Sequence, residues 1–349
     1  MTRRHCALVL LTTLVALVPI ILILSLGTGP VSIRPAEIAS ILLHDSGLVD
    51  ASPDDKLRLI IESIRLPRTL VGFMVGGALA VAGAAMQGLF RNPLADPSII
   101  GVASGSALGA SVSIVLGAIP FTMVAHGLLH NIEVPLMAFI GGITTTGLIY
   151  RIGTTGNGTS VTTMLLAGLA INALAGACIG FLSYIADDAT LRSLTYWQMG
   201  SMDSATWDMV LICTVTLLPA SLLLCRYAQV INVLLLGESE ARHLGVNIQR
   251  VKFQLITLSA LAVGVSVSVS GIISFVGLVV PHLIRLIVGP DHRILLPAST
   301  ILGGLLLVCA DMLSRTLIAP AELPIGIVTS LMGAPFFMVI LWQQRQRIS

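Results

Sequence analysis

Apolar runs of about 20 residues recur from one end of this sequence to the other, and they restrict its fold more than any other feature. A helix needs about 20 consecutive apolar residues to cross the hydrocarbon core of a bilayer. A membrane β-barrel would instead show alternating segments of about ten residues. The sequence therefore predicts an all-α integral membrane protein with about ten transmembrane helices, at residues 7–27, 67–89, 97–118, 133–151, 162–185, 207–226, 251–270, 272–288, 295–314 and 324–342.

Composition agrees with a single membrane domain that covers residues 1–349. Charged residues make up 10% of the chain, whereas a soluble domain carries about 25%. The first apolar run follows Arg3 and Arg4, is longer than the core of a signal peptide, and has no small-residue cleavage site behind it. We therefore expect a retained first helix and no appended soluble domain.

Basic residues near the ends of the spans predict the orientation of the chain. An even number of spans places both termini on one side, and most of the 19 Lys and Arg residues fall on that side. Because cytoplasmic loops are enriched in Lys and Arg, we expect both termini in the cytoplasm. Residues 28–66 then lie outside and residues 227–250 inside. In the outer segment, the spacing of Ile38, Ile41 and Leu42 predicts a short surface helix with these residues on one face.

Small residues repeat at every fourth position in two of the spans. Such rows form a smooth ridge on one helix face, where the backbone of a second helix can approach closely. Helix packing is the expected role, and a pore-lining role for the same faces is the alternative. The two rows are Gly76, Ala80, Ala84 and Gly88, and Gly101, Gly105 and Gly109.

Ionisable residues inside a span mark transport pathways when they occur. Few occur here: Asp311 lies near an outer helix end, and His282 and Arg285 lie in the inner half of their span. A carrier driven by protons or sodium usually places carboxylates or broken helices at the membrane midplane. Their scarcity counts against ion-coupled secondary transport.

The sequence lacks the common signatures of catalysis. The chain has two lysines, Lys56 and Lys252, and neither belongs to a phosphate-binding loop, while no zinc-protease H-E-x-x-H motif occurs. We therefore expect no enzymatic activity, no bound metal and no ATP site. The five cysteines are scattered without a C-x-x-C pair and are expected to be small buried apolar residues; they are Cys6, Cys178, Cys213, Cys225 and Cys309.

Three long runs carry a resemblance to a known family. They are RLPRTLVGFMVGGALAVAGAAMQGLFRNPLADPSIIGVASGSALGA (65–110), GIISFVGLVVPHLIRLIVGPDHRILLP (271–297) and AELPIGIVTSLMGAPFFMVIL (321–341). In order and spacing, the chain from about residue 30 to residue 342 resembles the FecCD/BtuC-like permeases of ABC importers, which take up iron–siderophores, haem or cobalamin.

The resemblance implies a BtuC-like permease fold and a type II importer in the bacterial inner membrane. Two copies of the chain would form the translocation path as a homodimer. Two separate ATP-binding-cassette ATPase subunits would use the ATP, and a periplasmic binding protein would deliver the ligand. The transported ligand would be haem or a ferric siderophore, with cobalamin as the alternative within the family. The chain itself would bind no cofactor and no nucleic acid.

The resemblance also assigns a docking role to basic residues at the periplasmic rim. In this family such residues meet acidic residues on the binding protein, and the matching positions here are Arg65, Arg68 and Arg315. The alternative for these three side chains is anchoring of helix ends or local ion pairing.

The turn at residues 91–97 is a candidate cytoplasmic gate. Pro93 and Pro97 break the helix, and Asp96 is placed to cap the next helix with Pro97 at its first position. The resemblance implies in addition that Asn92 and Leu94 help to close the path.

The fifth span and its neighbours would line the path. The polar candidates there are Thr162, Thr163, Asn172 and Ser183, for which hydrogen bonding between helices is an equal explanation. His282 belongs to the family motif, and we expect a packed, hydrogen-bonded histidine rather than a haem ligand.

The polar stretch GESEARHLGVNIQR (237–250) interrupts the apolar chain. We expect a first short helix that starts at Asn232 and covers Val233, Leu234 and Leu236, and a second one from Glu238 to Leu244. Gly237 separates the two helices, and Gly245 is the favoured residue just past a helix end.

The charges of the second short helix suit its dipole. Glu238 and Glu240 lie at its positive end and Arg242 and His243 at its negative end. Glu238 and Arg242 are also spaced to form an i,i+4 ion pair. The resemblance matches this segment to the cytoplasmic helices that couple the permease to its ATPase, which assigns coupling to Gly237, Glu238, Glu240, Arg242, His243 and Gly245.

Overall fold

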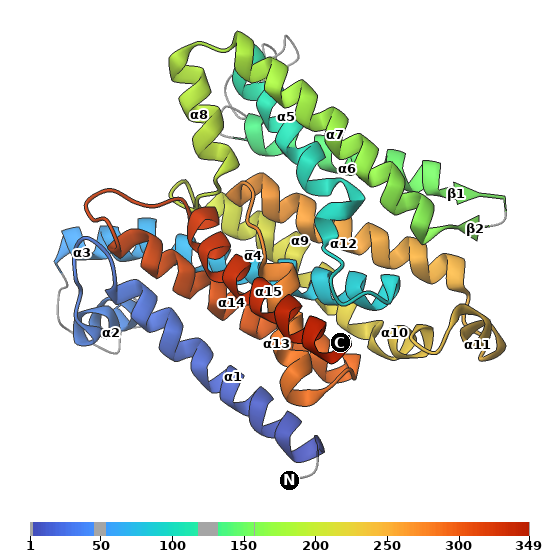
Figure 1. Cartoon of the computed structure of the whole chain (residues 1–349). Coiled ribbons are helices and arrows are strands. Elements are labelled where there is room, and N and C mark those ends of the chain that lie inside the picture. Colours follow the sequence, from blue (N-terminus) through green and yellow to red (C-terminus); the bar gives the residue numbers. More distant parts are fainter. Residues whose placement is uncertain (1–2, 45–53, 118–131, 157, 349) are drawn as a thin grey trace.

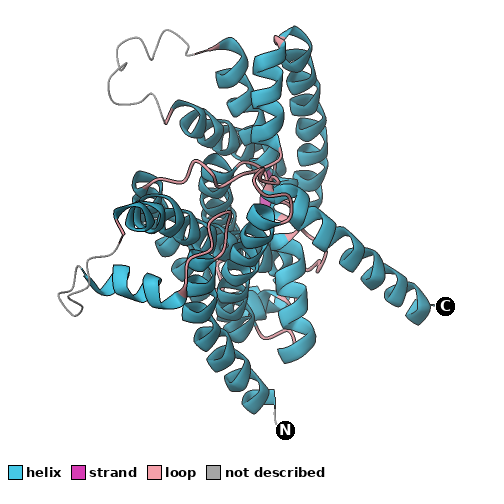
Figure 2. Ribbon diagram, turned by 90° about the vertical axis from the view of Figure 1, so that its left-hand side faces the viewer, coloured by secondary structure: helices cyan, strands magenta, loops and turns pink. Residues whose placement is uncertain are grey.

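The computed structural model describes residues 3–44, 54–117, 132–156 and 158–348, and most of them lie in helices (Figures 1 and 2). The elements in chain order are α1 (Arg3–Gly27), α2 (Pro35–His44), α3 (Asp55–Leu59), η1 (Ile60–Arg65), α4 (Leu66–Phe90), η2 (Pro97–Ile100), α5 (Val102–Leu116), α6 (Glu133–Gly153), β1 (Thr154–Thr155), β2 (Gly158–Thr159), α7 (Val161–Ile185), α8 (Asp188–Gln198), α9 (Trp207–Arg226), α10 (Ala228–Leu234), α11 (Glu238–His243), α12 (Ile248–Ser270), α13 (Val276–Val288), α14 (His292–Thr316) and α15 (Ile325–Ile348).

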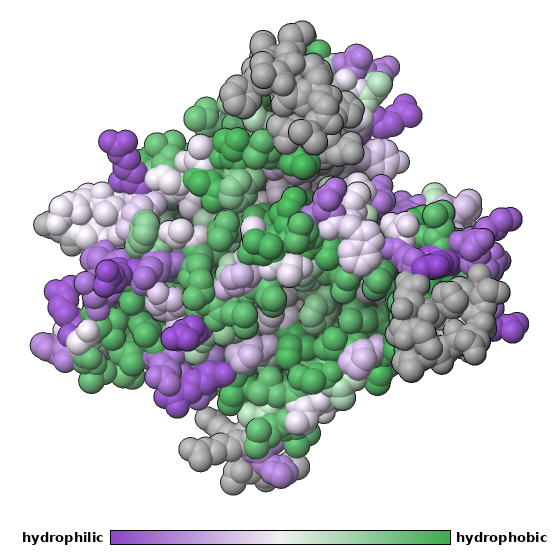
Figure 3. All heavy atoms as spheres, turned by 180° about the vertical axis from the view of Figure 1, so that it is seen from behind, coloured by the Kyte–Doolittle hydropathy of each residue, from purple (hydrophilic) through white to green (hydrophobic). Residues whose placement is uncertain are grey.

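Each of the ten predicted spans contains a helix of the structure. Seven helices of the described residues are long and apolar enough to cross a membrane, and three shorter apolar helices account for the other spans. Apolar residues also cover broad areas of the surface between hydrophilic margins (Figure 3). Such a surface is suited to contact with lipid tails rather than water. The prediction of an all-α, multi-pass membrane protein is confirmed.

Two spans begin with irregular backbone and are shorter than predicted. Residues 97–100 form the single 3₁₀ turn η2, and α5 starts only at Val102. Before α13, both Gly271 (φ 66°) and Phe275 (φ 68°) take the left-handed conformation. A left-handed residue cannot continue a right-handed helix, so α13 starts at Val276 rather than at the predicted residue 272.

The outer segment is more helical than the sequence suggested. Helical structure runs without a break from Asp55 to Phe90 over 36 residues, with a stretch of π-helix at η1. The residues before α4 are partly charged, so a prediction based on apolar runs did not include them in the helix. The predicted surface helix exists as α2. Of the three residues predicted to share one face, Ile38 and Ile41 are buried, whereas Leu42 is 41% exposed at the edge of that face.

Two elements have no counterpart in the predicted set. The helix α8 follows α7 and is capped by Asp187, whose carboxylate accepts a hydrogen bond from the Thr190 amide. Hydrogen bonds from the Thr190 side chain and amide lower the pKa of Asp187. The second element is the hairpin β1–β2, in which Thr154 pairs with Thr159 and Thr155 with Gly158.

The helix α4 lies at the centre of the fold. Of its most apolar stretch, 83% is buried, compared with 11% for α1 at the edge. It packs against α9, α12, α13 and α14, and a Cβ atom on Gly76 would overlap the carbonyl oxygen of Gly303 in α14. In the same way, Gly105 of α5 lies against Gly141 of α6. Helix packing, as predicted, accounts for both rows of small residues.

Candidate translocation and coupling sites

The candidate sites fall on two opposite sides of the molecule. The helices α10 and α11 and the hairpin β1–β2 lie together on one side, whereas α3 and α8 lie on the opposite side (Figure 1). We name these the α11 side and the α8 side. The chain order assigns the α11 side to the predicted cytoplasmic segment and the α8 side to the predicted outer segment.

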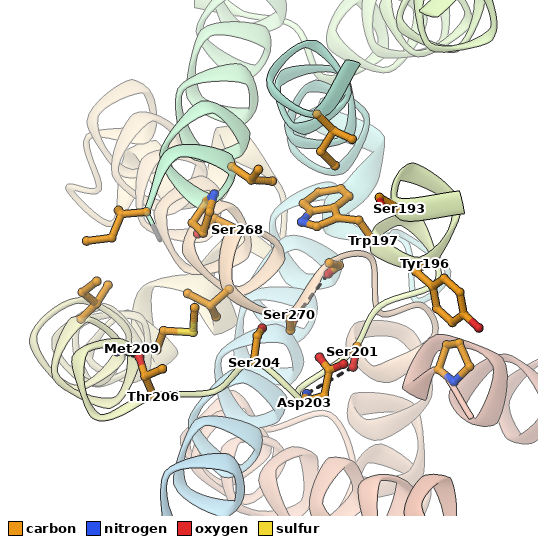
Figure 4. Close-up of a pocket in the computed structure, with 18 of the residues that line it drawn as sticks. Ser193, Tyr196, Trp197, Ser201, Asp203, Ser204, Thr206, Met209, Ser268 and Ser270 are labelled. Carbon is orange, nitrogen blue, oxygen red and sulfur yellow. Dashed lines mark hydrogen bonds between the residues drawn. The ribbon is translucent and has the colours of Figure 1, made fainter. Parts of the chain in front are cut away.

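A cavity of about 680 Å³ lies on the α8 side, between α8, the start of α9 and the end of α12 (Figure 4). Its volume is in the range of small-molecule sites, about 300–1,000 Å³. Tyr196 and Trp197 of α8 supply aromatic surface, and Ser268 and Ser270 of α12 supply small polar groups. The other polar lining residues are Ser193, Ser201, Asp203, Ser204, Thr206, Asp208 and Glu322.

This lining combines a flat apolar wall with acidic and hydroxyl groups. Trp197 faces the cavity from α8, and Ser201, Asp203 and Ser204 border it from the loop that leads to α9 (Figure 4). The Ser201 hydroxyl accepts a hydrogen bond from the Asp203 amide at 3.2 Å, which orders this loop. Such a lining can contact both apolar and polar groups of a bound molecule.

The cavity residues were not among the sequence-based candidates. The signals were present in the serine-rich end of α12, SVSVS (266–270), and in the loop SMDSATWD (201–208). These two segments are separated in the chain by more than two helices. Only the packing of α8 and α9 beside α12 brings them to one cavity.

The three predicted docking arginines do come together on the α8 side, but they lie in the interior. The exposed fractions of Arg65, Arg68 and Arg315 are 5%, 4% and 2%. Arg68 contacts both Asp311 and Glu322 at 2.8 Å, and the Arg315 Nε lies 3.0 Å from the other Asp311 oxygen.

Two of the arginines also fasten the end of α1. Arg65 donates to the backbone carbonyls of Leu26, at 2.6 Å, and Val31. Arg315 donates to the Ser25 hydroxyl at 2.9 Å. Local ion pairing and anchoring of a helix end therefore describe these side chains in this conformation. Docking of a partner through them stays a prediction, and it requires their present contacts to open.

The coupling segment contains two short helices separated by Gly237 (φ 125°), as the sequence predicted. The second helix, α11, ends in a Schellman arrangement. The Val246 amide donates to the Ala241 carbonyl and the Gly245 amide to the Arg242 carbonyl, with Gly245 at φ 82°. Glu240, Arg242 and His243 are exposed on this helix, so they are accessible to a partner.

Two details of the coupling segment differ from the prediction. The first short helix starts at Ala228, not Asn232. The Asn232 side chain instead reaches the turn before α14, where its amide donates to Asp291 at 2.7 Å and its oxygen accepts from the His292 amide at 3.0 Å. Burial raises the pKa of Asp291, but hydrogen bonds from Arg293 and Asn232 outweigh it and lower that pKa overall.

The ion pair of Glu238 is the second difference. Its carboxylate lies 2.8 Å from the ammonium of Lys252 in α12, not against Arg242 as the i,i+4 spacing suggested. Lys252 is 4% exposed. A buried ammonium needs a nearby acceptor more than an exposed guanidinium does, which explains the choice of partner.

The candidate gate residues lie in one tight turn after α4. Asn92 accepts a hydrogen bond from the Leu94 amide at 3.0 Å, and Arg91 (φ 49°) is left-handed. Asp96 is extended and accepts from the Ser98 amide at 2.8 Å, so its predicted role as a cap is confirmed. The turn follows the end of α4 at which Gly88 packs against Ile231 of α10.

The path-lining candidates lie outside the described cavity. Thr162 and Thr163 are exposed at the start of α7, where the Thr163 hydroxyl donates to Ser160 at 3.0 Å. Asn172 accepts a hydrogen bond from Ser104 of α5, and Ser183 donates to a backbone carbonyl within α7. Hydrogen bonding within or between helices describes Asn172, Thr163 and Ser183.

No cluster of metal-ligand side chains is found in the described part of the chain. His282 packs edge-on against Phe336, with ring centroids 6.3 Å apart. The five cysteines are free thiols at separate places.

Known proteins resemble this chain over almost its whole length. A model of the FecCD transport family matches residues 17–343. The hemin transport system permease protein HmuU of Yersinia pestis is 44% identical over 330 residues, which cover 95% of each chain. The cobalamin import system permease protein BtuC of Halobacterium salinarum is 42% identical over 290 residues, 83% of this chain and 75% of that protein.

A solved structure gives the same result for the fold. It is described as an inward-facing conformation of a metal-chelate type ABC transporter, and it is 33% identical, with a TM-score of 0.82 over 95% of this chain and 98% of that chain. The family match, the permease relatives and the ten helical spans agree from end to end, and the chain therefore belongs to the FecCD transport family of ABC importer permeases.

Proposed function

We propose that this chain is the membrane-spanning subunit of an importer for an iron chelate, haem or a ferric siderophore. The main support for this substrate class is the 44% identity, over 95% of both chains, to a hemin permease. The aromatic and polar walls of the 680 Å³ cavity suit a large flat ligand, and so support the proposal.

The chain acts as a transport subunit and not as an enzyme, with ATP used by a separate ATPase subunit. The ATPase binds on the α11 side, where Glu240, Arg242 and His243 are exposed, and Gly237 and Gly245 set the angles of α11. Both chain termini then lie in the cytoplasm of a bacterial cell, beneath the inner membrane. The positive-inside distribution of Lys and Arg supports this orientation.

A second copy of the chain completes the path. The helix α7 is 22% buried in its most apolar stretch, so a large part of its surface, including Thr162, is available to lipid or to the other copy. Asn92 and Leu94 close the inner end. A periplasmic binding protein delivers the ligand to the α8 side, where Arg65, Arg68 and Arg315 are concentrated.

In each cycle, ATP binding closes the ATPase dimer and displaces α11. The path opens alternately to the α8 side and the α11 side around the ligand. The spans carry few ionisable residues, so the energy enters through the ATPase contact and not through an ion gradient.

Uptake by the reconstituted importer tests this function. The chain would be placed in proteoliposomes with its ATPase and binding protein, and uptake of haemin, a ferric siderophore and cyanocobalamin would be measured with ATP. We expect uptake of an iron chelate that stops when the ATPase is catalytically inactive. Uptake of cyanocobalamin alone would overturn the substrate class, and uptake driven by an ion gradient with an inactive ATPase would overturn the ABC mechanism.

A further inference from the structure

Lys252 is one of only two lysines in the chain, and it lies at the inner start of α12. Its side chain is 5% exposed. An ammonium group in such a place is costly unless each of its donors finds a partner. The identity of its partners therefore matters, and they come from two different elements.

The first partner is Glu238, the first residue of α11, at 2.8 Å from the Lys252 Nζ. The second is the backbone carbonyl of Thr159 in β2, which accepts from the same Nζ at 2.9 Å. One ammonium group thus holds the coupling helix and the hairpin β1–β2 together.

The hairpin is also held by a neighbour of Lys252 on α12. The Gln249 side-chain oxygen accepts a hydrogen bond from the Thr159 amide at 2.9 Å. Both the amide and the carbonyl of Thr159 are therefore bound by α12 side chains. A Cβ atom on Gly158 would overlap the Gln249 amide, which shows how closely the hairpin packs there.

The hairpin leads directly into α7. Thr159 is followed by Ser160, whose hydroxyl accepts from the Thr163 amide and caps the helix that starts at Val161. A single residue, Ser160, thus separates Thr159 from the start of α7. A displacement of α11 that keeps the Glu238–Lys252 pair moves this junction as well.

We propose that Lys252 transmits the movement of α11 to α7, and that the contacts Glu238–Lys252–Thr159 form the connection between ATPase and path. The inference rests on the proposed function, because it assumes that α11 contacts the ATPase. Beyond that contact, the movement passes through the side chain of Lys252. The connection is polar and directional, and it is distinct from the apolar packing that holds the helices together.

Two substitutions of Lys252 and one control substitution test the connection. Lys252→Met keeps the length and apolar stem but removes the charge and all donors. Lys252→Arg keeps the charge and enough donors for both contacts. Lys56→Met removes the other lysine, which is exposed in α3 on the opposite side of the molecule. Each variant would be reconstituted with the ATPase and binding protein, and uptake per ATP hydrolysed would be measured with the melting temperature.

For Lys252→Met we expect uptake per ATP hydrolysed to fall about tenfold, while ATP hydrolysis continues. A factor of about ten corresponds to the lower end of the range for the loss of one hydrogen bond to a charged group. Lys252→Arg would restore the ratio to near that of the native chain, and Lys56→Met would leave it unchanged. A purely structural role predicts instead a lower melting temperature and a parallel loss of hydrolysis and uptake. A native ratio in Lys252→Met would overturn the proposal.

Glu238→Gln keeps the test decisive if Lys252→Met does not assemble. The Glu238 side chain is 39% exposed, and Gln keeps its length and one oxygen that can accept a hydrogen bond from Lys252. We therefore expect this substitution to disturb the fold less than Lys252→Met does. We expect a lower ratio of uptake to ATP hydrolysed in Glu238→Gln alone. Where Lys252→Met does assemble, the double variant should show no further loss relative to Lys252→Met, because both substitutions act through one contact. Additive losses, or a native ratio in Glu238→Gln, would contradict the connection. Absence of ATP-dependent uptake in the native chain would contradict the proposed function instead.

Discussion

At the scale of single residues, several buried charged groups of the described chain contact a group of opposite charge. Arg68 and Arg315 share the carboxylate of Asp311, and the exposed fraction of that carboxylate's side chain is 3%. Lys252 shares its ammonium between Glu238 and Thr159. Breaking a buried pair from one side leaves an uncompensated charge, and this costs more than the pair contributes.

Asp311→Asn removes the charge that two buried arginines share. We expect a loss of about 3 kcal/mol in the free energy of unfolding, because both guanidinium groups lose their common counter-ion. Thermal unfolding of the purified protein in detergent would measure the loss.

The matched control is Glu62→Gln, which breaks the half-exposed Arg58–Glu62 pair at 3.0 Å. Exposed pairs contribute about 0–1 kcal/mol, so its melting temperature should change little. Equal effects of the two substitutions would show that Asp311 is not the centre of a buried cluster.

At the scale of helices, small residues decide which elements can meet. The backbones of α5 and α6 cross where Gly105 faces Gly141, and neither position has room for a Cβ atom. Further along α6, Gly147 has nothing within 4 Å of where a Cβ atom would lie. Two glycines on one helix therefore have different roles.

Gly141→Val and Gly147→Val separate these roles. The first substitution forces α5 and α6 apart, and we expect it to cost about 3 kcal/mol or to prevent folding. The second changes only helix propensity, by about 1 kcal/mol or less. Size-exclusion profiles and melting temperatures in detergent compare the two, and a stable Gly141→Val protein would refute the close crossing.

The helix α11, the proposed coupling helix, differs from these packed helices because it is short and its charged side chains are exposed. Charge reversal at Glu240 or Arg242 should leave the protein folded, because both side chains are exposed. We expect each reversal to uncouple ATP hydrolysis from uptake by disturbing the contact with the ATPase. The measurement is uptake and hydrolysis in the same proteoliposomes, and normal coupled transport in both variants would refute the assignment.

At the scale of the whole molecule, the proposed site of ligand entry and the proposed site of energy input lie on opposite sides. The cavity lies on the α8 side and α11 on the other, with α12 reaching from one to the other (Figure 1). The cavity residues Ser268 and Ser270 and the connecting residue Lys252 belong to this same helix. One helix thus carries residues of both proposed sites.

Filling the cavity tests its part in transport. We expect Ser204→Trp, in the exposed loop at the cavity wall, to lower uptake severalfold without a change in melting temperature, since the indole occupies ligand space. The control is Leu211→Trp, which adds the same ring to the exposed membrane face of α9. Unchanged uptake in Ser204→Trp would exclude the cavity from the path.

Local patterns in the sequence determine much of the arrangement of the helices. The length of the apolar runs determines the ten helical spans, because a bilayer accepts only a backbone whose hydrogen bonds are satisfied internally. Gly237 and Gly245 determine where α11 begins and ends, since both have φ values that favour glycine. The small-residue rows determine the packing faces, and the long motifs determine the family.

Only the tertiary structure decided the partners of the polar side chains. The spacing in the sequence predicted that Glu238 pairs with Arg242. In the structure its carboxylate pairs with the buried ammonium of Lys252, which lies on another helix. The sequence-based prediction placed three arginines at the periplasmic rim, yet Arg68 is buried in the protein interior, where it pairs with Asp311 and Glu322. It named no cavity residue, since the lining comes from segments far apart in the chain. Local spacing determines backbone and amphipathic faces, whereas the partner of a charge depends on which distant groups share its low-dielectric surroundings.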